Sequence, residues 1–197
     1  FAAIGRLELL RLLHRRLHAV RVEPEYRRAI DDPRELDGYD LVVGADGLNS
    51  FVRTGLEREF GTTIEHQRNR FAWYGTTKRF ETLSQTFVSN EAGTFNAHHY
   101  RYAPQMSTFI VECDPDTWQR AGFAHRDEAE TKAYCEAVFA QTLAGHPLVA
   151  NRSVWRQFPK VWNERWHAGN RVLIGDALRT AHFSIGSGTR LAFEDAI

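Results

Sequence analysis

The stretch that decides the fold is DLVVGADGLNSFVR, residues 40–53. Residues 40–44 form a short apolar run between turn-forming residues, which is the pattern of a buried parallel strand. Gly44 and Gly47 bracket the loop that follows, and glycines let a backbone approach a ligand closely. The loop amides and the guanidinium of Arg53 suit a pyrophosphate or another anion. An ordinary strand-to-helix turn without a ligand would carry the same glycines.

A second stretch reads GNRVLIGDA at residues 169–177 and continues as GSGTRLAFED at residues 186–195. Asp176 follows a predicted strand at its carboxyl end, where α/β sheets bind ligands, and its carboxylate can accept hydrogen bonds from a diol. Gly186 and Gly188 open a predicted helix whose amides favour negative charge. The two stretches, in this order, indicate a ligand site more strongly than either alone, and their strands are predicted to share one parallel sheet.

The residues between the two stretches have a different character. Residues 69–112 are rich in aromatic and β-branched side chains separated by turn signals, which predicts an antiparallel sheet. Apolar periodicity and capping residues predict helices over 6–18, after Asp114 and over 126–144, and further strands over 20–22, 26–30 and 153–158. The fold class is therefore α/β, or α+β overall: a parallel-sheet domain with an inserted antiparallel sheet.

Composition excludes several function classes. Lys+Arg and Asp+Glu both number 25, without the basic excess of a nucleic-acid binder. No apolar run approaches the ~20 residues of a membrane helix, so no membrane partner is expected. Two cysteines without a CxxC indicate reduced thiols and a cytoplasmic location. His98 and His99 would point to opposite faces of a strand, and no metal site is predicted.

The two stretches carry a family resemblance. Residues 40–53 resemble the GADGxxSxVR signature of group A flavoprotein monooxygenases, the para-hydroxybenzoate-hydroxylase-like family, and residues 169–196 resemble that family's second signature. The resemblance implies a Rossmann-like FAD-binding domain, FAD as cofactor, and NAD(P)H and O₂ as co-substrates for hydroxylation of an activated aromatic ring. It implies these cofactor-binding residues: Asp46, Gly47, Arg53, Gly175, Asp176, Gly186, Ser187 and Gly188.

Three positions depart from the family pattern. The usual Gly-Asp-Ala-Ala-His is replaced by a sequence that ends in Leu178-Arg179. The usual proline is absent from the run His182–Ser184, and Arg190 stands where asparagine is common. These departures leave the side-chain roles of Arg179 and Arg190 open, while a backbone role of the glycines is unaffected.

Other runs resemble one branch of the family. AHFSIGSG at 181–188, WYGTT at 73–77 and AHHY at 97–100 are similar to the salicyloyl-CoA 5-hydroxylase and 2-aminobenzoyl-CoA monooxygenase branch. That likeness implies a small aromatic substrate carried as a CoA thioester. Substrate contacts are expected from the sheet, and His182 is the one candidate for a catalytic side chain. The expected substrate contacts are Trp73, Tyr74, His98 and Tyr100.

The expected organisation has three segments. Residues 1–65 form the middle part of the FAD-binding domain, residues 66–158 the β-rich substrate domain, and residues 159–197 the late part of the FAD-binding domain. The only methionine is Met106 and no GxGxxG occurs, so we expect a piece of a larger protein that alone binds FAD weakly and is inactive. Alternatives are a related flavoprotein halogenase or reductase, or a non-catalytic binding module on the same fold.

Overall fold

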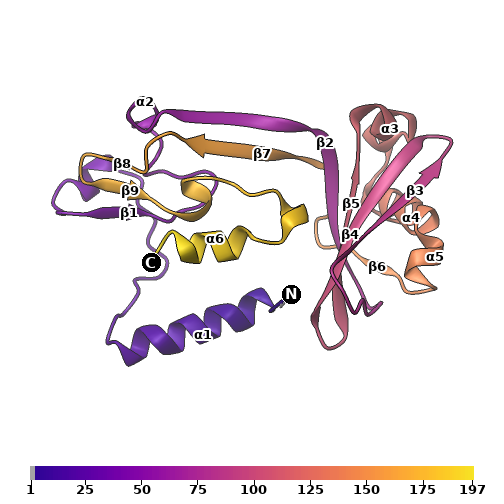
Figure 1. Ribbon diagram of the computed structural model, residues 1–197, viewed down its shortest axis with the longest axis horizontal. Helices are drawn as coiled ribbons and strands as arrows, with labels where there is room; N and C mark the ends of the chain where they lie inside the picture. The colour runs from indigo at the N-terminus through magenta and orange to yellow at the C-terminus, as the bar shows by residue number, and fades with distance from the viewer. Residues whose placement is uncertain (1–2) are drawn as a thin grey trace. The chain divides into compact units, whose positions relative to one another are not determined.

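The computed structural model describes residues 3–197 and divides the chain into two compact units (Figure 1). The antiparallel unit comprises the residues up to Pro24 together with Arg68–Gln157, and the parallel unit comprises Glu25–Gln67 together with Phe158–Ile197. Phe1 and Ala2, where the first predicted segment begins, lie outside the described residues. The parallel unit is thus assembled from two separate stretches of sequence, one before and one after the antiparallel sheet.

The helices and strands of the described chain follow in order. The first half contains α1 (Arg6–Ala19), η1 (Pro33–Leu36), β1 (Val42–Gly44), α2 (Glu57–Phe60), β2 (Thr62–Thr76), β3 (Ser84–Asn90) and β4 (Gly93–Ala103). The middle contains β5 (Met106–Cys113), α3 (Pro115–Arg120), η2 (Phe123–His125), α4 (Glu128–Val138), α5 (Ala140–Leu143) and β6 (Leu148–Val149). The last part contains β7 (Arg156–Asn163), β8 (His167–Ala168), β9 (Arg171–Leu173), η3 (Gly175–Ala177), η4 (Phe183–Ile185) and α6 (Gly188–Glu194).

The parallel unit is built on a three-stranded sheet in the order β1-β9-β8. β1 and β9 are parallel, with Val43 opposite Val172, and β8 runs antiparallel to β9. This pairing confirms the prediction that the two short apolar runs share one parallel sheet. Beneath the sheet lies a small apolar core of Val42, Val52, Phe60, Leu173, Ala177 and Leu178.

The antiparallel unit is built on a six-stranded sheet in the order β3-β4-β5-β2-β6, with β7 paired to β2. One face of this sheet packs against the helices through apolar side chains, as the α+β prediction requires. Its core joins strand residues such as Phe95, Phe109 and Val111 to Cys135 and Phe139 on the helical side. The aromatic and β-branched run at 69–112 therefore forms the predicted sheet, which extends to Cys113.

The segment before β1 differs from the prediction. The helix predicted at 6–18 is confirmed as α1, although none of its residues is buried. The strands predicted at 20–22 and 26–30 are wrong, and neither stretch has regular structure. Arg21 and Arg27 have φ values of 57° and 59°, a left-handed conformation that interrupts an extended chain.

Two further elements have boundaries that differ from the predicted ones. The helix predicted over 126–144 begins with a capping box of Asp127 and Glu130, but it divides into α4 and α5 at Phe139. The ring of Phe139 is fully buried and packs edge-on against Phe109 at a centroid distance of 5.3 Å. The strand predicted over 153–158 begins instead at Arg156 and continues to Asn163. Within residues 3–197, no helix combines the length and apolar character that crossing a membrane requires.

Candidate functional site

The two glycine-containing loops leave the parallel sheet at the same edge. β1 and β9 are parallel, with Gly44 opposite Leu173, so the residues that follow each strand emerge at the carboxyl ends. Gly44 is needed for this packing, because a Cβ there would lie 2.8 Å from Leu173 Cδ2 and 2.9 Å from Val52 Cβ. The glycine pattern of residues 40–53 thus has a steric cause within the fold.

Asp46 stabilises the first loop. Its Oδ2 accepts hydrogen bonds from the backbone amides of Phe51 at 2.6 Å and Val52 at 3.2 Å. Gly47, next in sequence, has a φ of +81°, which favours glycine. One oxygen of Asp46 is therefore occupied by its own loop, and a role of Asp46 and Gly47 at a cofactor remains a prediction.

Arg53 connects the two loops. Its side chain is buried, and Nη1 donates to the carbonyl of Ala177 at 2.8 Å while Nη2 donates to the carbonyl of Leu48 at 2.5 Å. Burial lowers the pKa of the guanidinium from its ordinary value. Within residues 3–197, the buried Nε of Arg53 has no hydrogen-bond partner. Two of the three guanidinium nitrogens thus hold carbonyls, and an anion contact of Arg53 remains a prediction.

Asp176 presents a carboxylate just after β9. It lies in η3, at the carboxyl edge of the parallel strands, and its side chain is exposed. No hydrogen bond to its carboxylate occurs among the described residues. Partial desolvation raises the pKa of this carboxyl from its ordinary value. Asp176 is thus an acceptor without a protein donor, as a ligand with hydroxyl groups would require.

Asp195 fastens the second loop to helix α6. Its carboxylate, whose side chain is only 1% exposed, accepts from the Gly175 amide at 2.9 Å and from Arg179 Nη2 at 2.5 Å. The guanidinium of Arg179 also lies over the ring of Trp166, 5.0 Å from its centroid. These contacts give Arg179, the first departure from the family pattern, a structural role. Arg190, the other arginine departure, forms an exposed pair with Glu194 at 2.7 Å.

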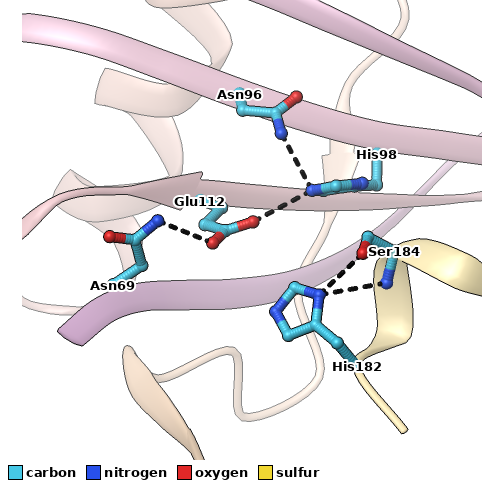
Figure 2. Close-up of polar contacts among 6 residues, drawn as sticks. All are labelled: Asn69, Asn96, His98, Glu112, His182 and Ser184. Carbon is cyan, nitrogen blue, oxygen red and sulfur yellow. Dashed lines mark hydrogen bonds and ion pairs between the residues drawn. The ribbon is translucent and has the colours of Figure 1, made fainter. Parts of the chain in front are cut away.

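The segment before α6 is partly exposed, with Ile185 and Gly186 both exposed. Gly186 has a φ of +59°, Gly188 has open space around a built Cβ, and Ser187 Oγ donates to the Ile185 carbonyl at 3.1 Å. His182, in the same segment, is half-buried, and its Nδ1 lies 2.8 Å from Ser184 Oγ (Figure 2). There is room beside the backbone of Gly188, while contact of residues 186–188 with a flavin and a catalytic role for His182 remain predictions.

The predicted substrate residues divide between the two faces of the antiparallel sheet. Trp73 and His98 both lie opposite Ile110 in the register and therefore share a face, and alternation along β4 puts Tyr100 on that face too. Tyr74 lies on the other face, 1% exposed within the helix-covered core. The structure thus separates Tyr74 from the other three, and we omit it from the site proposed below.

A buried polar cluster accompanies His98 on its face of the sheet. His98 Nε2 lies 3.0 Å from Glu112 Oε2 and 3.0 Å from Asn96 Nδ2 (Figure 2). The other Glu112 oxygen accepts from Asn69 Nδ2 at 2.9 Å. The residues of His98 and Glu112 are 3% and 8% exposed. The sequence prediction missed Glu112, although a charged residue inside the apolar run FIVEC is a signal of a buried carboxylate.

Histidine 99 contrasts with its neighbour. His99 faces the helices, where its ring stacks on Phe109 at a centroid distance of 5.5 Å and its Nε2 contacts Thr86 Oγ1 at 2.8 Å. Burial, and then the charge of His98, lower the pKa of His99 to about 4. The prediction that the two histidines point to opposite faces is confirmed. Among the described residues, no group of three or more metal-ligating side chains comes together.

The fold places glycine loops at the carboxyl ends of two parallel strands, the edge at which α/β domains bind their ligands. The model of the family described as FAD binding domain matches residues 15–197, and the chain belongs to this family. The fold-class prediction is thereby confirmed.

Curated relatives are similar over nearly the whole chain. Salicyloyl-CoA 5-hydroxylase of a Streptomyces species is 44% identical over 100% of this chain and 40% of its own length. The 3-hydroxy-4-methyl-anthranilyl-[aryl-carrier protein] 5-monooxygenase of Streptosporangium sibiricum is 40% identical over 98% of this chain and 51% of its own length. The chain thus spans about half, or less, of the length of these relatives.

Solved structures share the fold. PqsL, a probable FAD-dependent monooxygenase from Pseudomonas aeruginosa, superposes with a TM-score of 0.55 at 21% sequence identity. The match covers 80% of this chain and 43% of that chain.

The residues of the parallel unit fit FAD as a cofactor. Asp176 offers a carboxylate without a protein donor, which suits the hydroxyl groups of a ribityl chain. The orphaned Nε of Arg53 and the loop amides beside it suit a pyrophosphate. The open backbone at Gly188 suits the approach of a flat ring system. Each of these features belongs to the parallel unit.

Proposed function

We propose that this chain forms part of an FAD-dependent monooxygenase that hydroxylates an activated aromatic ring, with NAD(P)H and O₂ as co-substrates. The observation that carries the proposal is the Asp176 carboxylate, unpartnered among the described residues, at the edge where two parallel strands end in glycine loops. The names of the curated relatives support the reaction class, because they are monooxygenases or hydroxylases of aromatic groups. A halogenase or reductase is not favoured for the same reason.

The parallel unit would hold the cofactor and the antiparallel unit the substrate. Asp176 would bind the ribityl hydroxyls, the loop of Asp46 and Gly47 with Arg53 the pyrophosphate, and the 186–188 backbone the ring. Bound FAD would supply the redox chemistry that activates O₂. The chain's own work is positioning: Arg53 and Asp195 hold the loops that carry the cofactor contacts.

The substrate we propose is an aryl-CoA thioester with a hydroxyl or amino group next to the acyl carbon on the ring. Two relatives support this choice, since their names specify a salicyloyl-CoA and an anthranilyl group on a carrier protein. Trp73, His98 and Tyr100 would contact the ring from one face of the sheet. NAD(P)H oxidation by the full-length protein should rise with salicyloyl-CoA. Equal stimulation by free salicylate, with no effect of the thioester, would reject this substrate class.

Replacement of Asp176 tests the cofactor assignment. We expect Asp176→Ala in the full-length protein to weaken FAD binding roughly tenfold or more, because a ligand-binding acceptor is lost. Asp40→Ala is the matched control, since Asp40 precedes the same strand pair at its opposite end. Isothermal titration with FAD and flavin absorbance provide the measurements. Equal FAD affinity in the wild type and Asp176→Ala would contradict the assignment.

A further inference from the structure

A cavity of about 420 Å³ lies at one end of the antiparallel sheet, within the antiparallel unit. The loop before β3 forms one side of it, and the last residues of β4 form another. The volume falls within the roughly 300–1,000 Å³ range of small-molecule sites. The residues of these two sides that carry the argument are Phe80, Glu81, Leu83, Tyr100, Arg101 and Tyr102. None of them belongs to the proposed FAD contacts.

β4 presents an unpaired backbone edge beside this cavity. β3 begins at Ser84, which pairs with His99, whereas β4 continues to Ala103. Over residues 100–103 β4 therefore has β5 on one side and, in the described chain, no strand on the other. A bulge between Arg101 and Ala103 interrupts the regular ladder here, as bulges often do next to binding sites. Backbone N–H and C=O groups at such an edge can pair with the amide groups of a ligand.

The side chains of the cavity favour a neutral ligand. Arg101 Nη2 lies 3.7 Å from Glu81 Oε2, and both side chains are exposed. Because these two charges offset each other, neither an anion nor a cation meets an excess of opposite charge. The other large side chains are aromatic or aliphatic, namely Phe80, Leu83 and Tyr102. Apolar walls beside a backbone edge suit a flexible chain in which amide groups alternate with aliphatic segments.

Tyr100 connects the cavity to the proposed ring contacts. It lines the cavity, and it shares a face of the sheet with Trp73 and His98, one row further along β4. A ligand whose ring lies against Trp73 and His98 can therefore extend past Tyr100 into the cavity. The proposed thioester substrate has such an extension at its acyl carbon. This is the pantetheine arm, which contains two amide groups joined by aliphatic segments.

We propose that this cavity binds the pantetheine arm of the acyl thioester, an inference that rests on the proposed function. The amides of the arm pair with the open edge of β4 over residues 100–103, and its dimethyl segment packs against Phe80, Leu83 and Tyr102. No bond is made or broken in the cavity. Contacts made far from the reacting ring hold the ring in position, so the cavity contributes to binding and orientation. The nucleotide end of CoA stays outside the cavity.

Substrates that differ in the arm test the site in the full-length protein. Salicyloyl-pantetheine carries the whole arm, and salicyloyl methyl thioester carries none. We expect the arm to raise kcat/KM of the wild type at least about tenfold, mainly through a lower KM, because its contacts do not take part in the chemistry. Equal kcat/KM for the two substrates overturns the proposal.

Two donors of the same arm are compared to identify its source. Salicyloyl-CoA should have a lower KM than a salicyloyl group carried on the phosphopantetheine of a carrier protein. The reverse order contradicts CoA as the source of the arm.

Two variants reduce the volume of the cavity, Ala103→Phe on β4 and Thr82→Trp in the loop before β3. Each should raise the KM for salicyloyl-pantetheine about tenfold and leave that for the methyl thioester within about twofold of the wild type. Ser89→Trp is the matched control for Thr82→Trp, because Ser89 is also an exposed polar residue but lies near the far end of β3. An equal effect of the variants on both substrates, or no effect on either, overturns the proposal.

The comparison of substrates in the wild type decides the case if neither variant folds. A wild type that hydroxylates no salicyloyl thioester overturns the proposed function, and this inference with it. An active wild type that does not distinguish substrates with and without the arm overturns the inference alone.

Discussion

The candidate sites of the two units differ in the structural elements that carry them. In the parallel unit the candidate binding groups lie on loops, and the side chains of Arg53 and Asp195 accept or donate hydrogen bonds that hold the main chain of these loops. In the antiparallel unit the candidate substrate contacts are side chains on a regular ladder, where the neighbours His98 and His99 occupy opposite faces. A change in the first unit is therefore expected to act on the whole site, whereas a change in the second should act at one position.

The largest expected effect lies at Asp195 in the parallel unit. Asp195→Ala leaves Arg179 and the Gly175 amide without their shared acceptor, and breaking a buried pair in this way typically costs about 3–5 kcal/mol. We expect that loss in urea unfolding of the full-length protein, together with a loss of bound FAD. Glu194→Ala, one residue away and exposed, is the control and should change stability little.

The double variant Arg179→Met, Asp195→Leu sharpens this prediction. Because it removes both charges, it should recover much of the stability that Asp195→Ala loses. FAD binding should stay weak, because the Gly175 amide is still without its acceptor. Wild-type flavin content in Asp195→Ala would show that the loop holds its shape without this contact.

A smaller, pH-dependent effect is expected from His99 in the antiparallel unit. Its folded pKa of about 4 lies below the ordinary value of 6.5, so the unfolded chain binds more protons between these two values. Stability is therefore fully present above about pH 6.5 and is lost as the pH falls toward 4, by about 3 kcal/mol at most. Urea unfolding across this range should show the loss.

The variant His99→Leu tests whether this residue is the cause. It should flatten the pH dependence between pH 6.5 and 4, whereas the exposed His125→Gln should leave it unchanged. An unchanged slope in His99→Leu would assign the loss of stability to other groups.

The smallest effect on stability is expected at Gly44, where the packing of the parallel unit leaves no space for a side chain. Gly44→Ala introduces a Cβ within 3 Å of Leu173 and Val52. Overpacking of this kind costs about 1–3 kcal/mol, and we expect about 2 kcal/mol in urea unfolding. Gly38→Ala, where a Cβ meets nothing within 4 Å, is the control. Equal stability of Gly44→Ala and Gly38→Ala would mean that β1 and β9 shift enough to accommodate the extra methyl group.

The difference between loops and regular strands also explains which parts of each unit could be predicted from the sequence. A short apolar run that ends in a glycine is recognisable in the sequence. The strands at Gly44 and before Gly175, and their parallel pairing, were therefore predicted. The contacts of Arg53 and Asp195 were not, because they join residues that are distant in sequence. The strands predicted at 20–22 and 26–30 failed because local propensity does not report a left-handed residue such as Arg21.

The antiparallel sheet was predicted as a sheet, but its faces were not assigned. Alternation gives Trp73 and Tyr74 opposite faces without saying which face meets the helices. That choice depends on α4 and α5, which pack on the side of Tyr74. Glu112 was missed because its significance comes from His98 on the neighbouring strand, a pairing that register alone decides.

The pairing of β1 with β9 also has a consequence for how the chain is made. Hairpins such as β3–β4 join neighbouring residues and can form as soon as both strands leave the ribosome. The partner of β1 is β9, which is synthesised only after the whole antiparallel unit. During that interval its edge is unpaired and open to association with other chains. We expect nascent chains that end before Arg171 to require chaperone protection that longer chains do not.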